Sequence, residues 1–170
     1  EKAIAEIHTA GIAIHGMFIF GEDHDTFETL RDTVDFAIKQ NIGTVQFMVL
    51  TPFPGTQLYE KLSNEKRIFH TNWDYFNGMY AVYQPRTMSA AQLQKEAIAA
   101  YQKFYSLRRI ALSVLNLGFH LILDALVWEF GRAMRYSFEL MLLKAGANFL
   151  IRKFAATYEV PYSQLTQNEY

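Results

Sequence analysis

A single glycine, Gly21, follows the apolar run IAIHGMFIF at residues 12–20. Glycine has no Cβ, so at the end of a buried strand it lets a ligand approach the backbone closely. Ile19 and Phe20, directly before it, could line an apolar slot for a flat ring. The same glycine also suits a plain strand-to-helix turn with Asp25 as the helix cap, and spacing alone favours this simpler interpretation.

The second candidate is the turn TPFPGT, which follows the apolar run at residues 44–50. Pro52 and Pro54 fix their own φ and push the residues before them into extended conformations. Gly55 can adopt backbone angles closed to larger residues, and Thr56 can cap the next helix. The turn therefore predicts a rigid rim where the second strand ends, with or without a ligand.

Metal chemistry has little support in the sequence. The chain has no cysteine, which removes disulfides, zinc–thiolate sites and any iron–sulfur cluster held by its own thiolates. His15 lies inside a predicted strand, and His24 lies in a loop beside Asp23. The other histidines are scattered along the chain, so we predict that these side chains bind no metal.

Five elements with short connections position these candidates. A helix is expected over 1–11, with buried strands at 12–20 and 44–50. Between the strands, Asp25 and Glu28 have the spacing of a capping box for a helix that runs up to the second strand. A short helix follows the proline turn. Neither strand alternates polar and apolar residues, so the pattern predicts a parallel βαβ unit covered on both faces.

The second half of the chain is predicted to be mostly helical. We expect one more short strand at 79–85, then one long helix over 90–117 and a further helical pattern over 119–157. We therefore divide the chain into a β/α part, residues 1–88, and a helical C-terminal extension, residues 89–170.

Composition and charge narrow the classes of function. Hydrophobic residues make up 51% of the chain and aromatic residues 15%, which suits a packed core and is unlike a disordered chain. The net charge is −1, with 16 basic and 17 acidic residues, so no excess of positive charge indicates a nucleic-acid partner. No signal peptide precedes the first helix, and we expect a cytoplasmic protein.

The C-terminal third is strongly hydrophobic. Between Arg109 and Asp124 lie 14 residues without formal charge, whereas a membrane-spanning helix needs about 20 apolar residues. Charged residues then alternate with large apolar ones. A helical hairpin that packs on the rest of the protein is the simpler interpretation. Peripheral contact of residues 107–157 with a membrane surface is the alternative, and it predicts that this segment binds vesicles by itself.

Four segments in order resemble the C-terminal part of radical S-adenosylmethionine (SAM) proteins. They are GMFIFGEDHDTFETLRDTVDFA, VQFMVLTPFPGTQLYEKL, NWDYFNGMYAVYQPRTMS and AYQKFYS, within residues 12–109. The branch they resemble has an N-terminal cobalamin-binding domain and a helical extension after the barrel. The resemblance implies an α/β fold: the C-terminal βα units of a partial TIM-like barrel, followed by an α-helical extension.

The resemblance also implies where a cofactor would bind. In such barrels the fifth strand carries an apolar residue and, two positions later, a glycine at the edge of the SAM site; Ile19 and Gly21 match. The sixth strand supplies backbone contacts to adenine, and the matching residues are Phe47, Met48 and Val49. The rim on the substrate side corresponds to Thr51, Pro52, Pro54 and Gly55.

The chain also departs from the family. It lacks the C-x-x-x-C-x-x-C loop that binds the 4Fe-4S cluster, the first four strands and the cobalamin domain, and it has Phe76-Asn77-Gly78 where members often have Tyr-Asp-Gly. We therefore expect a fragment that needs a missing N-terminal half and is inactive alone. Its open strand edges predict poor solubility. No catalytic acid or base is identified.

The resemblance implies a reaction for the complete enzyme. Reductive cleavage of SAM yields a 5′-deoxyadenosyl radical that removes a hydrogen atom from the substrate, and methyl transfer follows in members that use cobalamin. Some members act on lipids or tetrapyrroles, so a small molecule of either kind is the expected substrate. Two alternatives stay open: another βα-barrel enzyme that binds a phosphate or nucleotide, and a helical interaction or membrane-surface module without catalysis.

Overall fold

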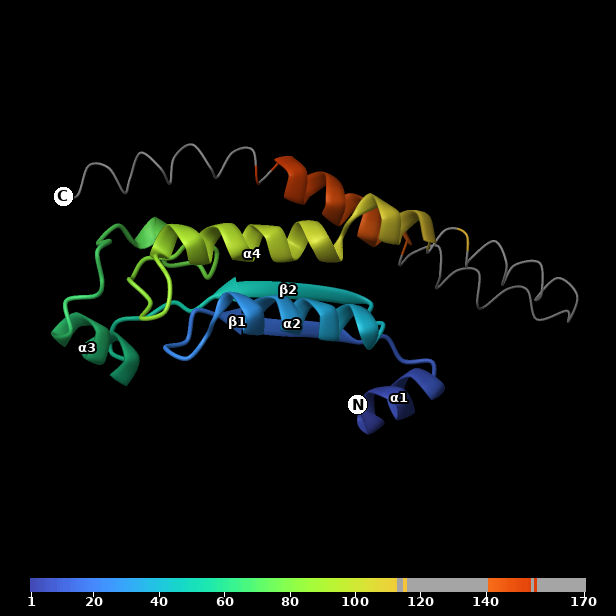
Figure 1. Ribbon diagram of the computed structural model, residues 1–170, viewed down its shortest axis with the longest axis horizontal. Coiled ribbons are helices and arrows are strands. Elements are labelled where there is room, and N and C mark those ends of the chain that lie inside the picture. Colours follow the sequence, from blue (N-terminus) through green and yellow to red (C-terminus); the bar gives the residue numbers. More distant parts are fainter. Residues whose placement is uncertain (113–114, 116–140, 154, 156–170) are drawn as a thin grey trace, which may run out of the picture.

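The computed structural model describes residues 1–112, 115, 141–153 and 155 of the 170-residue chain (Figure 1). In chain order, its elements are α1 (Lys2–Thr9), β1 (His15–Phe20), α2 (Phe27–Lys39), β2 (Thr44–Val49), α3 (Gln57–Asn64), a 3₁₀ turn (Trp73–Tyr75) and α4 (Ala90–Phe104). Residues 107–112 and 141–153 are also helical. The protein is therefore of the mixed α/β class, as its sequence predicts.

The two strands form a parallel pair connected by α2. Their register runs from His15 opposite Thr44 to Phe20 opposite Val49. A parallel pair needs a crossover connection, and the 13-residue helix α2 supplies it. The buried residues of α2 recur at helical spacing, which gives the helix one apolar side for the sheet. The predicted parallel βαβ unit is confirmed.

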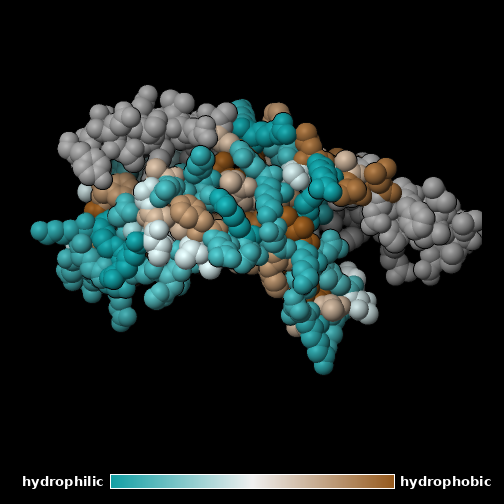
Figure 2. Space-filling model, viewed as in Figure 1, coloured by the Kyte–Doolittle hydropathy of each residue, from teal (hydrophilic) through white to brown (hydrophobic). Residues whose placement is uncertain are grey.

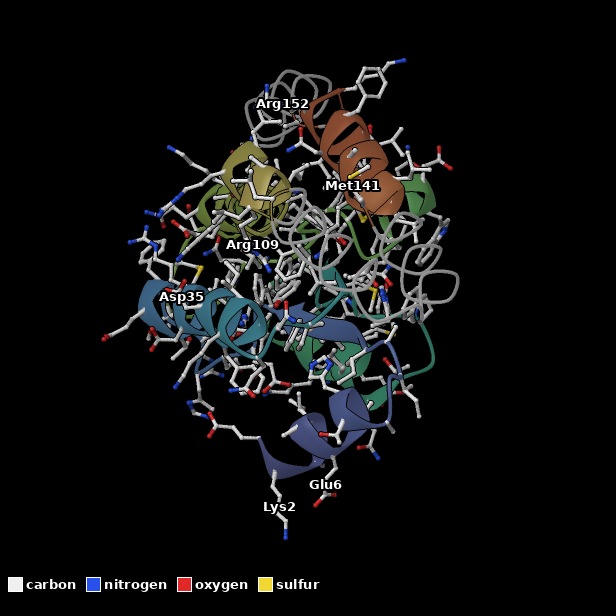
Figure 3. The ribbon with its side chains drawn as sticks, turned by 90° about the vertical axis from the view of Figure 1, so that its right-hand side faces the viewer. Lys2, Glu6, Asp35, Arg109, Met141 and Arg152 are labelled. Atoms are coloured by element: carbon white, nitrogen blue, oxygen red, sulfur yellow. The ribbon has the colours of Figure 1, made fainter. Side chains whose placement is uncertain are left out.

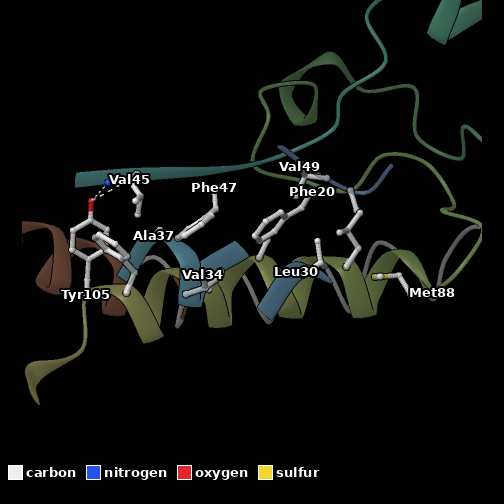
Figure 4. Close-up of a cluster of buried hydrophobic side chains, with 14 of the residues drawn as sticks. Phe20, Leu30, Val34, Ala37, Val45, Phe47, Val49, Met88 and Tyr105 are labelled. Carbon is white, nitrogen blue, oxygen red and sulfur yellow. Dashed lines mark hydrogen bonds between the residues drawn. The ribbon is translucent and has the colours of Figure 1, made fainter. Parts of the chain in front are cut away.

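One face of the sheet carries the core. α2 and α4 pack on this face, and Figure 4 shows their apolar side chains meeting those of the strands. The ring of Phe47 stacks on Phe18 and Phe20 at centroid distances of 5.5 and 5.3 Å. Apolar burial of this kind is the dominant favourable contribution to folding. Although α4 shares this core with the strands, the division into residues 1–88 and 89–170 stays a prediction.

The opposite face of the sheet is open among the described residues. Met17 is 61% exposed and Ile19 53% exposed, whereas Gly16 and Phe20 beside them are buried. The prediction that both faces are covered is therefore wrong for the described part of the chain. Both faces carry apolar side chains, so polar and apolar residues do not alternate in the sequence. Buried and exposed side chains nevertheless alternate along β1, because only one face is packed.

Side-chain caps set the starts of α2, α3 and α4. Thr26 caps α2: its hydroxyl accepts the N–H of Thr29, whose hydroxyl accepts the N–H of Thr26. The predicted capping box of Asp25 with Glu28 is wrong by one residue. The Asp25 carboxylate turns back instead and accepts the N–H of Gly21 at 2.8 Å. It therefore holds the turn after β1 while the threonine pair starts the helix.

The segment between α3 and α4 is described throughout and forms no regular strand. An isolated antiparallel bridge joins Ile68 to Tyr83, so the predicted strand at 79–85 is wrong. The buried side chain of Gln94 accepts the N–H of Ala81 at 2.9 Å. A side chain of α4 thus satisfies a backbone group that a neighbouring strand would otherwise pair.

Helix α4 is shorter than predicted. It ends at Phe104, and a second helical segment covers 107–112, where the sequence predicted one helix over 90–117. The break lies at Tyr105. Its hydroxyl accepts the N–H of Val45 on β2 and donates to the carbonyl of the same residue, both at 3.0 Å. Helix α4 therefore ends where Tyr105 contacts the edge of β2.

The C-terminal helical prediction falls partly on the described residues. The pattern over 119–157 is confirmed at 141–153, and most of the rest lies outside the described residues. In Figure 3 this helix, marked by Met141 and Arg152, and α1 lie on opposite sides of the molecule, with the sheet between them. In the described part of the chain, no helix is long and apolar enough to cross a membrane.

Candidate functional site at the carboxyl ends of the strands

Both strands end at the same edge of the sheet, because they run parallel. β1 leads into the loop that starts at Gly21, and β2 leads into the proline turn before α3. A cavity of about 310 Å³ lies between these segments, lined by the loop from Gly21 to His24, by α3 and by Tyr83. Ligands of open α/β sheets bind beyond the carboxyl ends of strands, so this edge is the candidate site.

Gly21 is required by the fold at this position. Its φ is +108°, which other residues adopt only under strain. A Cβ there would lie 2.6 Å from both Leu93 Cδ2 and the Tyr83 hydroxyl oxygen. That hydroxyl donates to the Gly21 carbonyl, and burial raises the pKa of Tyr83 well above its ordinary value, so the proton stays in place. The plain-turn role of Gly21 is confirmed, and its contact with a cofactor stays a prediction.

The structure brings two of the predicted cofactor residues together. Ile19 and Met48 are register partners on adjacent strands, and their side chains lie on the open face. Ile19 is 53% exposed, and Met48 is half-buried against Gly78. Together they form a small apolar surface next to the strand ends.

Phe47 and Val49 point the other way, into the helix-covered core, where they are 1% and 2% exposed. The N–H of Phe47 donates to the hydroxyl of Tyr101 at 3.0 Å, and the N–H of Val49 donates to the carbonyl of Gly78 at 2.7 Å. These two donors are already used within the protein. The carbonyl of Val49 also accepts the hydroxyl of Thr51 at 3.0 Å, and the predicted backbone contacts of both residues with a cofactor stay a prediction.

The proline turn forms a stiff exit from β2. Pro52 is buried, and the carbonyl of Phe53 accepts both the N–H and the hydroxyl of Thr56, which caps α3 as predicted. Gly55 has φ +81°, with open space where a Cβ would lie. The predicted rim residues Thr51, Pro52, Pro54 and Gly55 thus lie in one turn. The turn also leaves Phe53 52% exposed, an aromatic side chain that sequence analysis did not single out.

An ion-pair network closes one side of the cavity. Asp23 accepts from Arg67 at 2.5 Å and from Lys61 at 3.3 Å, and Arg86 lies 3.3 Å away. Glu65 bridges Arg67 and Arg86 at 2.8 and 3.2 Å. The hydrogen bond from Arg67 is the main cause that lowers the pKa of Asp23 to about 2, so this carboxylate is no proton donor near neutral pH. Sequence reasoning missed the network, because Asp23 and Arg67 are 44 positions apart.

The histidines do not converge on one site. His15 Nδ1 lies 2.8 Å from the Thr44 hydroxyl, at the amino ends of the strands, and His24 lies at the cavity. The buried His70 ring lies 4.4 Å from that of Tyr75, and its Nε2 has no hydrogen-bond partner. Among the described residues, no group of three His, Cys, Asp or Glu side chains lies close enough together to hold a metal ion.

Several known proteins that are similar to the chain are named for bacteriochlorophyllide d or for a magnesium-protoporphyrin ester. Bacteriochlorophyllide d C-12(1)-methyltransferase of Chlorobaculum tepidum is 31% identical over 105 residues, 62% of this chain and 23% of that protein. The C-8(2)-methyltransferase of the same organism is 30% identical over 115 residues, 68% of this chain and 26% of that protein. Anaerobic magnesium-protoporphyrin IX monomethyl ester cyclase of Rubrivivax gelatinosus is 25% identical over 105 residues, 62% of this chain and 19% of that protein.

The chain spans about a quarter of the length of the two methyltransferases it matches. No protein-family model matches it.

Proposed function

We propose that this chain is part of a radical SAM enzyme and forms C-terminal βα units of its barrel. The observation that carries the proposal is the unfinished sheet, whose open face presents the apolar side chains of Met17 and Ile19. A sheet of only two strands is marginal by itself, so further strands are expected to extend it. The similarity to much longer methyltransferases supports the same conclusion.

The two edges of the sheet indicate where those strands would lie. On β2, the outward N–H groups of Val45, Phe47 and Val49 are taken by two tyrosine hydroxyls and a backbone carbonyl. On β1, the backbone groups of Met17 and Ile19 face outward and have no partner among the described residues. Further strands would therefore add beside β1, and β2 would be the last strand.

The adenine side of the SAM site is assigned to Ile19, Gly21 and Met48, with backbone contacts from Phe47 and Val49. Adenine is flat and apolar on its faces, and the side chains of Ile19 and Met48 lie opposite one another near the strand ends, so they fit the ring. In this role they bind the ring, orient it and exclude water. SAM, when bound, supplies the 5′-deoxyadenosyl group for hydrogen abstraction.

The 4Fe-4S cluster and cobalamin do not fit this chain. It has no cysteine, and its described residues offer no group of three metal-binding side chains. A cluster would be held by residues outside this sequence, and cobalamin by a separate domain. We derive no reaction step through either group, and the chain alone is expected to be inactive.

The substrate we propose is a tetrapyrrole-like small molecule, with a lipid-like one as the alternative. The relatives are named for bacteriochlorophyllide d and for a magnesium-protoporphyrin ester. A flat, apolar macrocycle would suit the open face of the sheet and the exposed ring of Phe53 on the proline turn. We place the protein in the cytoplasm, acting on a small molecule rather than on nucleic acid.

The first test is to read the coding region upstream of Glu1. A continuous frame with the three-cysteine loop supports the proposal. The longer protein, reconstituted anaerobically with iron and sulfide, is then expected to convert SAM to 5′-deoxyadenosine, whereas this chain alone is not. A frame without those cysteines overturns the proposal. It would favour another βα-barrel enzyme that binds a phosphate or nucleotide, or a helical module without catalysis.

The second test locates the SAM site on this chain. In the longer protein, Ile19→Asp is expected to weaken SAM binding about tenfold, because a charge replaces an apolar contact. Met17→Asp is the matched control, since Met17 lies on the same face of β1 but further from the strand end. Equal losses of SAM affinity in the two variants would contradict the assignment of the adenine side.

A further inference from the structure

The helix at 141–153 exposes its apolar side. Leu142, Leu143, Phe149 and Leu150 are 53%, 61%, 68% and 63% exposed. The other three lie one, seven and eight positions after Leu142, which puts all four on one face of the helix. An ordinary surface helix turns such a face toward the core, so this one is reversed.

The other face of the same helix is fixed to the protein. Asn148 is buried and its side-chain amide donates to the carbonyl of Tyr105. Ala147 and Ile151 pack against the core cluster, and Ala155 is buried. The helix therefore points an amide inward and leucine and phenylalanine outward, and the hydrogen bond of Asn148 opposes rotation of the helix.

The neighbouring segment at 107–112 extends this apolar surface. Leu107 and Leu112 are 56% and 54% exposed, and Leu115 just beyond is 70% exposed. The two segments are neighbours, because the charge of Arg109 acts on Lys144 and Asn148 contacts the residue after α4. Figure 2 shows hydrophobic surface gathered over this part of the molecule, whereas hydrophilic surface covers the α2 and α3 side. We call these seven exposed side chains the apolar surface.

The segments that carry the apolar surface also carry basic residues. The described residues of 107–112, 115 and 141–153 include Arg108, Arg109, Lys144, Arg152 and Lys153 and no acidic residue. Arg108 and Arg152 are exposed. Helices that lie on membranes combine leucine and phenylalanine with lysine and arginine. Anionic headgroups attract such cations, so the charge complements a membrane surface.

We propose that the apolar surface binds an anionic membrane peripherally, with its leucine and phenylalanine side chains inserted between headgroups and with Arg108 and Arg152 on the phosphates. The described helices are too short or too polar to cross a bilayer, which is consistent with binding at the interface. This proposal does not depend on the SAM site or on any activity.

The test measures flotation of the complete chain with vesicles of phosphatidylcholine, with and without phosphatidylglycerol. The chain is expected to float with the anionic vesicles and not with the neutral ones. Leu143→Gln combined with Phe149→Gln should weaken binding at least about tenfold, because the inserted groups become polar. Both positions are exposed, so the far-ultraviolet circular dichroism should stay unchanged.

Two further variants make the test specific. Ile12→Gln with Met17→Gln is the matched control, because these side chains are also apolar, 58% and 61% exposed, and lie before β1 and on the open face of the sheet. It should leave vesicle binding within about twofold. Arg108→Gln with Arg152→Gln should weaken binding about tenfold and reduce its dependence on salt.

Three results would overturn the proposal. The first is equal binding to neutral and anionic vesicles or to neither, and the second is equal loss in the Ile12→Gln and Met17→Gln control. The third is a dimer in sedimentation, without vesicles, that the Leu143→Gln and Phe149→Gln variant separates, because a second copy of the chain would then cover the apolar surface.

Discussion

The two strands of the sheet are equally long and in register, yet their outer edges differ. Three successive outward N–H groups of β2, at Val45, Phe47 and Val49, are bound by hydroxyl and carbonyl oxygens from later in the chain. The outward groups of β1, at Met17 and Ile19, have no such partner among the described residues. Unpaired edges accept further strands, so the edge of β1 is the one open to pairing in the described part of the chain.

The two faces of the sheet also differ, and each strand contributes side chains to both faces. Phe47 of β2 lies in the middle of the core, whereas Ile19 of β1 lies on the open face. The outer edge of β1 is unpaired, and the face that carries Ile19 is uncovered. An unpaired edge is where further strands can add, and an uncovered apolar face is where a ligand or another element can pack. The comparison therefore separates residues that hold this fold together from residues available to a ligand or to further strands.

The largest effect is expected from a substitution in the buried core of the sheet. Phe47→Ala should lower the free energy of unfolding by about 3–5 kcal/mol, because it leaves a cavity between two stacked rings. Ile19→Ala on the open face should cost less than about 1 kcal/mol. Urea unfolding measures both. Similar losses would mean that Ile19 is covered in solution.

The next effect compares the two strand ends. Gly21→Ala after β1 should lower the free energy of unfolding by about 3 kcal/mol, because backbone strain adds to contact with Leu93 and Tyr83. Gly55→Ala after β2 meets open space and should cost only the strain, about 1 kcal/mol. Thermal or urea unfolding of the two variants measures both losses. A larger loss of free energy in Gly55→Ala than in Gly21→Ala would contradict the packing around Gly21.

A smaller effect tests the sealed edge of β2. Tyr105→Phe removes the partner of both backbone groups of Val45 and should cost about 1–2 kcal/mol. Hydrogen exchange at the amide of Val45 should become faster at the same time. Tyr59→Phe, whose hydroxyl has no hydrogen bond among the described residues, is the control and should change little. Unchanged exchange at Val45 would show that the hydroxyl does not seal this edge.

A pH-dependent effect concerns the ion pairs that join the segments after the two strands. The folded-state pKa of Asp23 is lowered from 3.8 to about 2, so its contribution to stability is fully present above about pH 4 and is lost as the pH falls toward 2. Asp23→Asn should remove this part of the pH dependence. The free energy of unfolding measured from pH 6 to pH 2 tests it, and parallel curves for parent and variant would contradict the assignment.

The sequence by itself determined the order of elements up to α3, the parallel βαβ unit, the cap at Thr56 and the stiff turn after β2. These features follow from residue periodicity and from the backbone preferences of glycine and proline, which act within a few positions. The resemblance of four segments to radical SAM proteins also indicated the ends of the strands, where Ile19 and Met48 lie side by side.

Only the tertiary structure decided which face of the sheet is covered, where α4 ends and which charges meet. The strands are apolar on both faces, so the choice of face depends on where α2 and α4 pack. The break at Tyr105 and the pair of Asp23 with Arg67 depend on contacts 60 and 44 positions apart. The reversed helix at 141–153 likewise follows from the hydrogen bond of Asn148 to Tyr105. Such contacts form between distant parts of the chain, and no local pattern encodes them.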